Sequence, residues 1–171
     1  TIIQNLAGQD ISVETPPDRG NSSNIRTDTY YDANGNVIVT VDPKGVITRT
    51  YYDALNRPIT VVQNLARTVA EAISNPNPPA AGTSESDIRT DTYYDEAGNV
   101  IATVEPRGVV TRTYYDSANR PVTVVNNLVG WDIYLDTPPA RGDGLSDGNV
   151  RTDIAYDQYG RRDFTTDSFG R

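Results

Sequence analysis

Short runs of β-branched and aromatic residues alternate with polar segments along almost the whole chain. Every residue from Val37 to Val41 is β-branched, and similar runs follow at 46–52 and 59–62. Such residues fit the half-buried surface of a pleated sheet and are mediocre helix formers. The pattern therefore predicts β structure, and the strands of one repeat are expected near residues 27–32, 36–42, 46–52 and 57–64.

The polar segments between these runs carry the residues that tight turns require. Two examples are Asp32-Ala33-Asn34-Gly35 and Asp42-Pro43-Lys44-Gly45. Aspartate at the first position bonds its own backbone, proline at the second presets φ, and glycine or asparagine at the fourth tolerates a positive φ. Because such short turns join antiparallel neighbours, the predicted fold class is all-β. The expected architecture is a repetitive antiparallel β-hairpin meander that forms a coiled or solenoid-like sheet.

One segment departs from the strand pattern. Leu65, Val69 and Ile73 are spaced by four, and Asn75-Pro76 ends the run, which predicts one short helix near 65–74. This helix belongs to one of three variable inserts, which span 7–25, 66–88 and 129–150. The first and third inserts lack the helical spacing and are predicted to be long loops or hairpin tips through residues 10–13 and 132–135.

The chain repeats itself. Residues 27–65 and 90–128 align without a gap at an offset of 63, and 29 of the 39 aligned positions are identical. Self-similarity at a fixed period indicates a repeat architecture, so a residue set that occurs in both copies is first explained by the repeat. We expect a single repeat array over residues 1–171, a fragment of a longer chain that starts and stops in mid-repeat. Its super-repeats are expected at about 1–59, 60–122 and 123–171.

Composition narrows the functional classes. The chain has two Phe and one Trp against eleven Tyr, and no Cys or His, which removes the usual zinc sites and a Ser-His triad. No apolar run approaches the ~20 residues of a membrane span. The net charge of −8 without a basic run disfavours a nucleic-acid partner. We therefore expect no enzyme activity, no cofactor and no metal site.

Tyrosine-aspartate pairs recur through the sequence at steps of 21, 42, 21 and 41 residues. Tyr-Asp-x-x-Gly near a period of 21, with Asp-Pro-x-Gly between, resembles the YD or RHS repeats of bacterial toxin shells, wall-associated proteins and teneurins. In this chain Asn36 and Asn99 replace the Arg that follows the Gly in that motif, and Asn56 and Asn119 replace the Gly itself. The predicted structural repeat residues are Tyr31, Asp32, Gly35, Tyr52, Asp53, Tyr94, Asp95, Gly98, Tyr115, Asp116, Tyr156, Asp157 and Gly160.

The resemblance implies a long antiparallel sheet of stacked hairpins that coils, in some members into a hollow shell. RHS toxins also carry an aspartate-based self-cleavage element, and Asp42-Pro43-Lys44-Gly45 is similar to its Asp-Pro-x-Gly. The sister turns begin at Glu105 and Asp167, so this position requires only an acidic residue that starts a turn. The Tyr-Asp pairs are likewise expected to cap turns, with one tyrosine of each Tyr-Tyr pair buried in a stack.

Two main functions remain open. The first is a structural extracellular repeat protein, a segment of a fibre, stalk or surface scaffold that associates with itself end to end. The alternative is a wall segment of an RHS-type toxin-encapsulating shell or adhesin, and a third reading is glycan or partner binding through the long hairpin tips. The expected location is extracellular or at the cell surface, where glycans or the surface itself are further partners. Asn21, in Asn21-Ser22-Ser23, is a candidate glycosylation site.

Overall fold

The chain forms two compact units, Thr1–Arg89 and Thr90–Arg171, each of which is described by itself. The computed structural model describes residues 2–4, 25–81, 86–130, 132–140 and 148–171. The first unit contains β1 (Ile2–Gln4), β2 (Ile25–Tyr31), β3 (Val37–Val41), β4 (Ile47–Tyr52), β5 (Pro58–Gln63) and α1 (Val69–Ser74). The second contains β6 (Ile88–Tyr94), which begins just before the boundary, β7 (Val100–Val104), β8 (Val110–Tyr115), β9 (Pro121–Asn126), β10 (Val150–Tyr156) and β11 (Arg162–Thr166).

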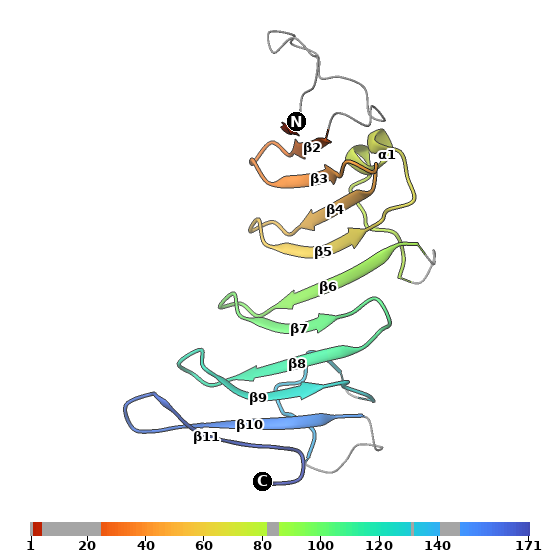
Figure 1. Ribbon diagram of the computed structural model, residues 1–171. Coiled ribbons are helices and arrows are strands. Elements are labelled where there is room, and N and C mark those ends of the chain that lie inside the picture. Colours follow the sequence, from red (N-terminus) through yellow and green to blue (C-terminus); the bar gives the residue numbers. More distant parts are fainter. Residues whose placement is uncertain (1, 5–24, 82–85, 131, 141–147) are drawn as a thin grey trace. The chain divides into compact units, whose positions relative to one another are not determined.

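Within each unit the strands pair in sequence order as antiparallel neighbours (Figure 1). The second unit repeats the arrangement from β6 through β11. The predicted all-β meander is therefore confirmed, the strand bounds lie within two residues of those expected, and the sheet does not close on itself. The expected coiling of the sheet stays a prediction.

The pleat of the first unit separates a covered face from an open one. On the covered face Arg49 lies opposite Val39 on one side and Val62 on the other, and both valines are fully buried. The open face carries rows of threonine, with Thr40 opposite Thr48, and these side chains are only half-buried. Successive strand residues point to opposite faces, so the alternation of Val or Arg with Thr decides which face needs a cover.

The insert that follows β5 supplies this cover. Leu65 and Ala72 join the same buried cluster as the valines of β3 and β5, and α1 packs against β3. A helix of six residues is not stable alone, so its burial and its cap hold it. Thr68 forms a capping box with Glu71, because each side chain accepts a hydrogen bond from the other residue's backbone N–H. The predicted helix near 65–74 is confirmed.

The third insert provides a different cover in the second unit. Leu128 occupies the position of Leu65, and its N–H donates to the Val110 carbonyl at 2.9 Å, as that of Leu65 does to Ile47. Residues 132–135 form a turn closed by the Leu135 N–H and the Asp132 carbonyl, so this segment is a loop and not an extended hairpin tip. The tip expected at residues 10–13 lies outside the described residues.

A matched pair of valines on β5 tests the assignment of the two faces. Val62 is fully buried, whereas its neighbour Val61 points to the open face and is half-buried. Val62→Ala is expected to lower the free energy of unfolding by about 2 kcal/mol, because it removes buried methyl groups and leaves a cavity. Val61→Ala should cost less than half as much. Urea unfolding of both variants measures the difference, and equal losses would contradict the assignment.

Candidate functional site

The repeated Tyr-Asp turn is the candidate site, and one carboxylate organises it. Asp32 Oδ1 accepts the backbone N–H groups of Asn34 and Asn36 at 2.9 and 2.8 Å, and its Oδ2 accepts the Asn36 side-chain amide at 2.9 Å. The backbone closes the same turn, from the Gly35 N–H to the Asp32 carbonyl and from the Asp32 N–H to the Asn36 carbonyl. Gly35 has a φ of 85°, which glycine adopts at little cost.

The other Asp turns repeat this geometry with two exchanges of residue type. At Asp53 the Oδ2 partner is the Arg57 Nε at 2.7 Å, so Asn and Arg at the last turn position both bring an N–H donor to the carboxylate. Asn56 takes the place of glycine with a φ of 59°, which asparagine tolerates. These exchanges explain the departures from the motif. The remaining aspartates that accept backbone N–H groups in the same way are Asp42, Asp95, Asp116, Asp157 and Asp167.

Hydrogen bonds hold the pKa of the carboxyl groups in the Tyr-Asp turns below the ordinary value. The Asn36 side-chain amide is the main cause at Asp32, and the backbone N–H of Arg57 is the main cause at Asp53. At Asp95 burial raises the pKa, but the hydrogen bonds from Asn99 outweigh it. The aspartates of the Tyr-Asp turns are therefore ionised at neutral pH and act only as acceptors.

A β-bulge follows each Tyr-Asp turn. Tyr31 pairs with Val37 and Tyr30 with Val39, so Ile38 is left as an extra residue in β3. The Asp-Pro-x-Gly turn between β3 and β4 has no such shift. A bulge interrupts the regular ladder of backbone hydrogen bonds. Carbonyl groups at the bulge then accept hydrogen bonds from side chains of the next strand. The register shifts at the other Tyr-Asp turns leave Ile59, Ile101, Val122 and Asp163 as the extra residues.

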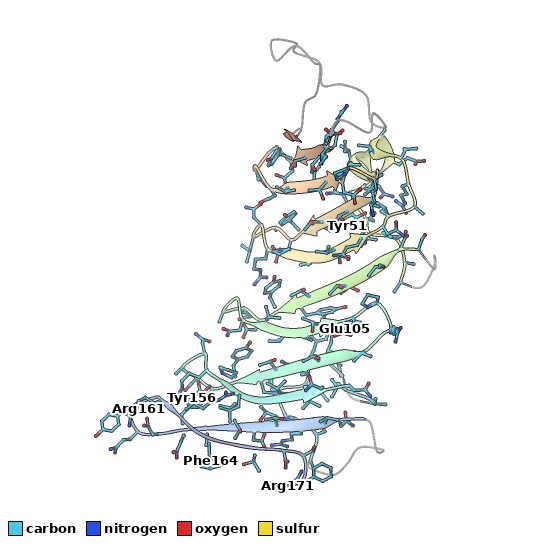
Figure 2. All side chains as sticks on the ribbon, viewed as in Figure 1. Tyr51, Glu105, Tyr156, Arg161, Phe164 and Arg171 are labelled. Carbon is cyan, nitrogen blue, oxygen red and sulfur yellow. The ribbon has the colours of Figure 1, made fainter. Side chains whose placement is uncertain are left out.

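At three of the Tyr-Asp turns, the tyrosine directly before the aspartate fastens the neighbouring hairpin at its bulge. The Tyr52 hydroxyl donates to the Val37 carbonyl, Tyr115 donates to Val100, and Tyr156 donates to the Pro121 carbonyl, each at 2.9 Å. Figure 2 shows Tyr156 close to the hairpin that carries Arg161. Tyr31 is exposed and Tyr94 is half-buried. The repeat residues predicted from the sequence thus belong to turns and to the strands that enter them.

In the Tyr-Tyr pairs of β4 and β8, the first tyrosine is buried and packs against an arginine. Tyr51 (labelled in Figure 2) and Tyr114 are about 95% buried, and so are Arg49 and Arg112. The guanidinium carbons lie 4.6 and 4.4 Å from the centres of the two rings. Arginine, rather than a second tyrosine, is therefore the ring partner in the predicted stack. Burial raises the pKa of the Tyr114 hydroxyl and outweighs the opposing effect of Arg112.

These two arginines are the functional residues that the sequence reasoning missed. Arg49 Nη1 donates to the carbonyl of the bulge residue Ile38 at 2.9 Å and to that of Thr50 at 2.7 Å, and Arg112 makes the equivalent bonds to Ile101 and Thr113. A signal was present, because in Thr-Arg-Thr-Tyr-Tyr-Asp the arginine precedes the first tyrosine by two residues. Strand alternation places both on one face.

The described residues offer no site for a metal ion, since nowhere among them do three His, Cys, Asp or Glu side chains converge. Asp32, Asn34 and Asn36 have the spacing with which a calcium-binding loop begins. The Asp32 carboxylate, however, accepts hydrogen bonds from the backbone of its own turn. Asn21 lies outside the described residues. No helix in the described part of the chain is long and apolar enough to cross a membrane.

The Asp turn predicts a pH-dependent stability difference. Asp53→Asn should lower the melting temperature at pH 7, because it removes a carboxylate whose pKa is depressed below 3.8 in the folded state. A depressed pKa contributes stability above the unfolded value, and this stability is lost as the pH falls through the folded value. The difference from wild type should therefore be smaller at pH 3 than at pH 7.

The matched control is Glu105→Gln, which removes the same charge from a turn. The Glu105 backbone closes its turn with Gly108 and Val109, but no hydrogen bond of its carboxylate is observed among the described residues. Its melting temperature should equal that of wild type at both pH values. Thermal unfolding followed by circular dichroism measures all three proteins, and equal effects of the two variants would refute the role of the aspartate.

Comparisons with known proteins agree with this repeat. A profile of the family described as RHS Repeat matches residues 31–68 and 94–127, which include the Tyr-Asp turns at Asp32, Asp53, Asp95 and Asp116. No curated protein matches the chain.

Several solved structures are similar to the chain at low identity. The Photorhabdus luminescens Tc holotoxin pore, in a mutant of TccC3, shares 18% identity over 81% of this chain and 7% of its own, with a TM-score of 0.46. A TcdB2-TccC3 structure shares 15% identity over 82% of this chain and 10% of its own, with a TM-score of 0.27. This chain spans a tenth or less of the length of these proteins. The two matched segments of this chain, residues 31–68 and 94–127, are RHS repeats.

Proposed function

We propose that this chain is a wall segment of an RHS-type shell, whose task is structural rather than catalytic. The observation that carries the proposal is the use of the repeated polar residues. The turn carboxylates accept hydrogen bonds from their own turns, and Tyr52 and Tyr115 fasten neighbouring strands. The side chains that recur from repeat to repeat therefore build the sheet.

The two faces of the sheet also suit a wall. In the first unit the insert covers one face with Leu65 and α1, while the other face keeps half-buried threonines. The inserts leave the sheet at the edge opposite the Tyr-Asp turns, because antiparallel strands alternate in direction. Variable sequence can therefore gather on one face of a wall while the hairpins stay constant.

A self-associating fibre is the second candidate, and the near identity of the two copies favours it. Polymers favour near-identical units, whereas a shell must vary along its length to close around a cargo. In the isolated 171-residue chain, the last strand of the second unit offers a surface for such association. β11 is paired with β10 alone in the strand order, and Phe164 on it is exposed. An open strand edge is a template for a further strand.

The full-length protein that contains this segment tests the wall. Negative-stain electron microscopy is expected to show closed hollow particles of one size. Limited proteolysis should then spare a domain enclosed by the particle and cleave the same domain when it is expressed alone. Filaments of variable length, or equal cleavage of the domain in both forms, would contradict the wall and favour the fibre. Recovery of the protein from the medium or the cell surface would support the extracellular location that we propose.

Association of the 171-residue chain tests the second candidate. The net charge of −8 opposes association at low salt, and screening beyond ~10 Å at 0.1 M salt weakens this repulsion. If β11 is an assembly edge, light scattering should show larger species as salt is raised. Phe164→Lys should abolish them, because lysine on an edge strand opposes pairing.

Phe169→Lys is the matched control for this experiment. Phe169 is 81% exposed and lies in the turn after β11, so the substitution adds the same charge outside the strand. Its scattering should follow that of the wild type. A monomer in every buffer, or equal effects of the two lysines, would rule out β11 as an assembly edge.

A further inference from the structure

Each unit contains a cavity of the same size at an equivalent place. In the first unit a cavity of about 510 Å³ lies between β3, β4, the adjacent Asp turns and the insert. In the second unit a cavity of about 510 Å³ lies between β7, β8, the turn at Asp95 and the third insert. Residues 63 apart line both, namely Asp32 and Asp95, Ile38 and Ile101, Arg49 and Arg112, and Tyr51 and Tyr114. The volume is typical of small-molecule sites.

A positive charge without a carboxylate partner lies in the wall of each cavity. Arg49 and Arg112 are 6% and 4% exposed, yet no acidic side chain among the described residues forms an ion pair with either. The described arginines that do have such partners include Arg26, Arg57 and Arg151. Buried charges are normally paired, so Arg49 and Arg112 are exceptions, and the exception occurs twice.

The unused hydrogen-bond donors of Arg49 lie on one edge of its guanidinium group. Both observed hydrogen bonds of Arg49 leave from Nη1, and its Nε has no partner among the described residues. Nε and Nη2 form the edge that grips a carboxylate through two parallel hydrogen bonds. In Arg112 the Nε is likewise unpaired, and Nη2 makes a single long bond of 3.4 Å to the Leu135 carbonyl.

Tyrosine adds a donor and an aromatic surface to this edge. The hydroxyl groups of Tyr51 and Tyr114 are buried without a hydrogen-bond partner among the described residues. In the second unit Tyr134 from the insert also lines the cavity and contacts Tyr93 edge-on at 6.1 Å between ring centres. A ligand with an anionic oxygen and an apolar face would place the oxygen near the arginine and the apolar face against the tyrosine rings.

The mouth of each cavity carries acceptors. Asp32, Asn34 and Asp53 line the first cavity, and Asp95, Glu96 and Asp136 line the second. Ionised carboxylates repel a simple anion but accept hydrogen bonds from hydroxyl groups. The lining therefore favours a compact molecule that has one carboxylate for the arginine and several hydroxyl groups for the mouth.

We propose that each cavity binds a sugar acid of the uronate class, with its carboxylate toward the guanidinium group of Arg49 or Arg112 and its hydroxyl groups toward the acidic mouth. This inference is independent of the wall function, since fibre and wall contain the same hairpins. It assigns a ligand to the covered face of the sheet and not to the tips of the inserts. It also predicts two equivalent sites in the chain.

Titration of the 171-residue chain with D-glucuronate tests the proposal. Isothermal titration calorimetry is expected to give two sites per chain. D-Glucose, which lacks the carboxylate, should bind at least tenfold more weakly, as expected when a charged hydrogen-bonded partner is lost. Acetate, which lacks the hydroxyl groups, should also bind at least tenfold more weakly. No binding of glucuronate would overturn the proposal, and so would acetate or glucose binding as tightly as glucuronate.

Substitutions at exposed tyrosines distinguish the two cavities without disturbing the core. Tyr134 is 64% exposed, so Tyr134→Ala should leave the fold intact and weaken only the second site, which reduces the number of strong sites from two to one. Tyr159→Ala is the control, since Tyr159 is 74% exposed and lines neither cavity. Two unchanged sites in Tyr134→Ala, or a loss in Tyr159→Ala, would overturn the assignment.

Arginine variants provide the final test. Arg112→Gln should lower the affinity of one site at least tenfold and leave the other unchanged, while circular dichroism reports whether the sheet is retained. If this buried substitution unfolds the second unit, chemical-shift changes of the first unit should still follow glucuronate and not glucose in the same variant. Loss of discrimination between the two sugars there would refute the role of Arg49.

Discussion

The hydrogen bonds of one aspartate carboxylate fix the geometry on which the rest of the sheet depends. At Asp32 the side chain accepts two backbone N–H groups and one side-chain donor within five residues. The turn therefore has one length and one direction. Because a slip of one residue would exchange the two faces of the next strand, this local constraint also decides that Val39 is buried and Thr40 is not.

The bulge after each Tyr-Asp turn connects the turn to the interior. It leaves Ile38 outside the regular pairing, and Arg49 of the next strand donates to the Ile38 carbonyl. The same guanidinium packs on the ring of Tyr51. Turn, bulge, arginine and tyrosine thus form one connected unit, and its copy around Arg112 has the same contacts. The turn and the core are therefore joined through consecutive contacts.

Much of this fold follows from local sequence. Strand positions and turns could be predicted because β-branched runs and Asp-x-x-Gly spacing act over a few residues, and α1 because Leu65, Val69 and Ile73 repeat at helical spacing. The bulges could not be predicted, since a register shift appears only when two strands are paired. The cavities were also missed, because the Ile38 carbonyl that Arg49 bonds and the insert that covers Arg49 are distant from it in sequence. The tyrosine ring was expected to stack on another tyrosine. The structure instead places the arginine two residues earlier over the face of the ring.

The placement of the inserts has a consequence for how such chains change over time. The inserts after β5 and β9 differ in sequence and structure, yet the flanking strands keep one register, with Arg49 opposite Val62 and Arg112 opposite Val125. Length and composition at this edge therefore vary without a change in the hairpins, since the Tyr-Asp turns and their bulges lie at the other edge. An insertion after β5 or β9 should therefore cost little free energy of folding. Within this chain, the inserts after β5 and β9 therefore differ far more than the hairpins that flank them.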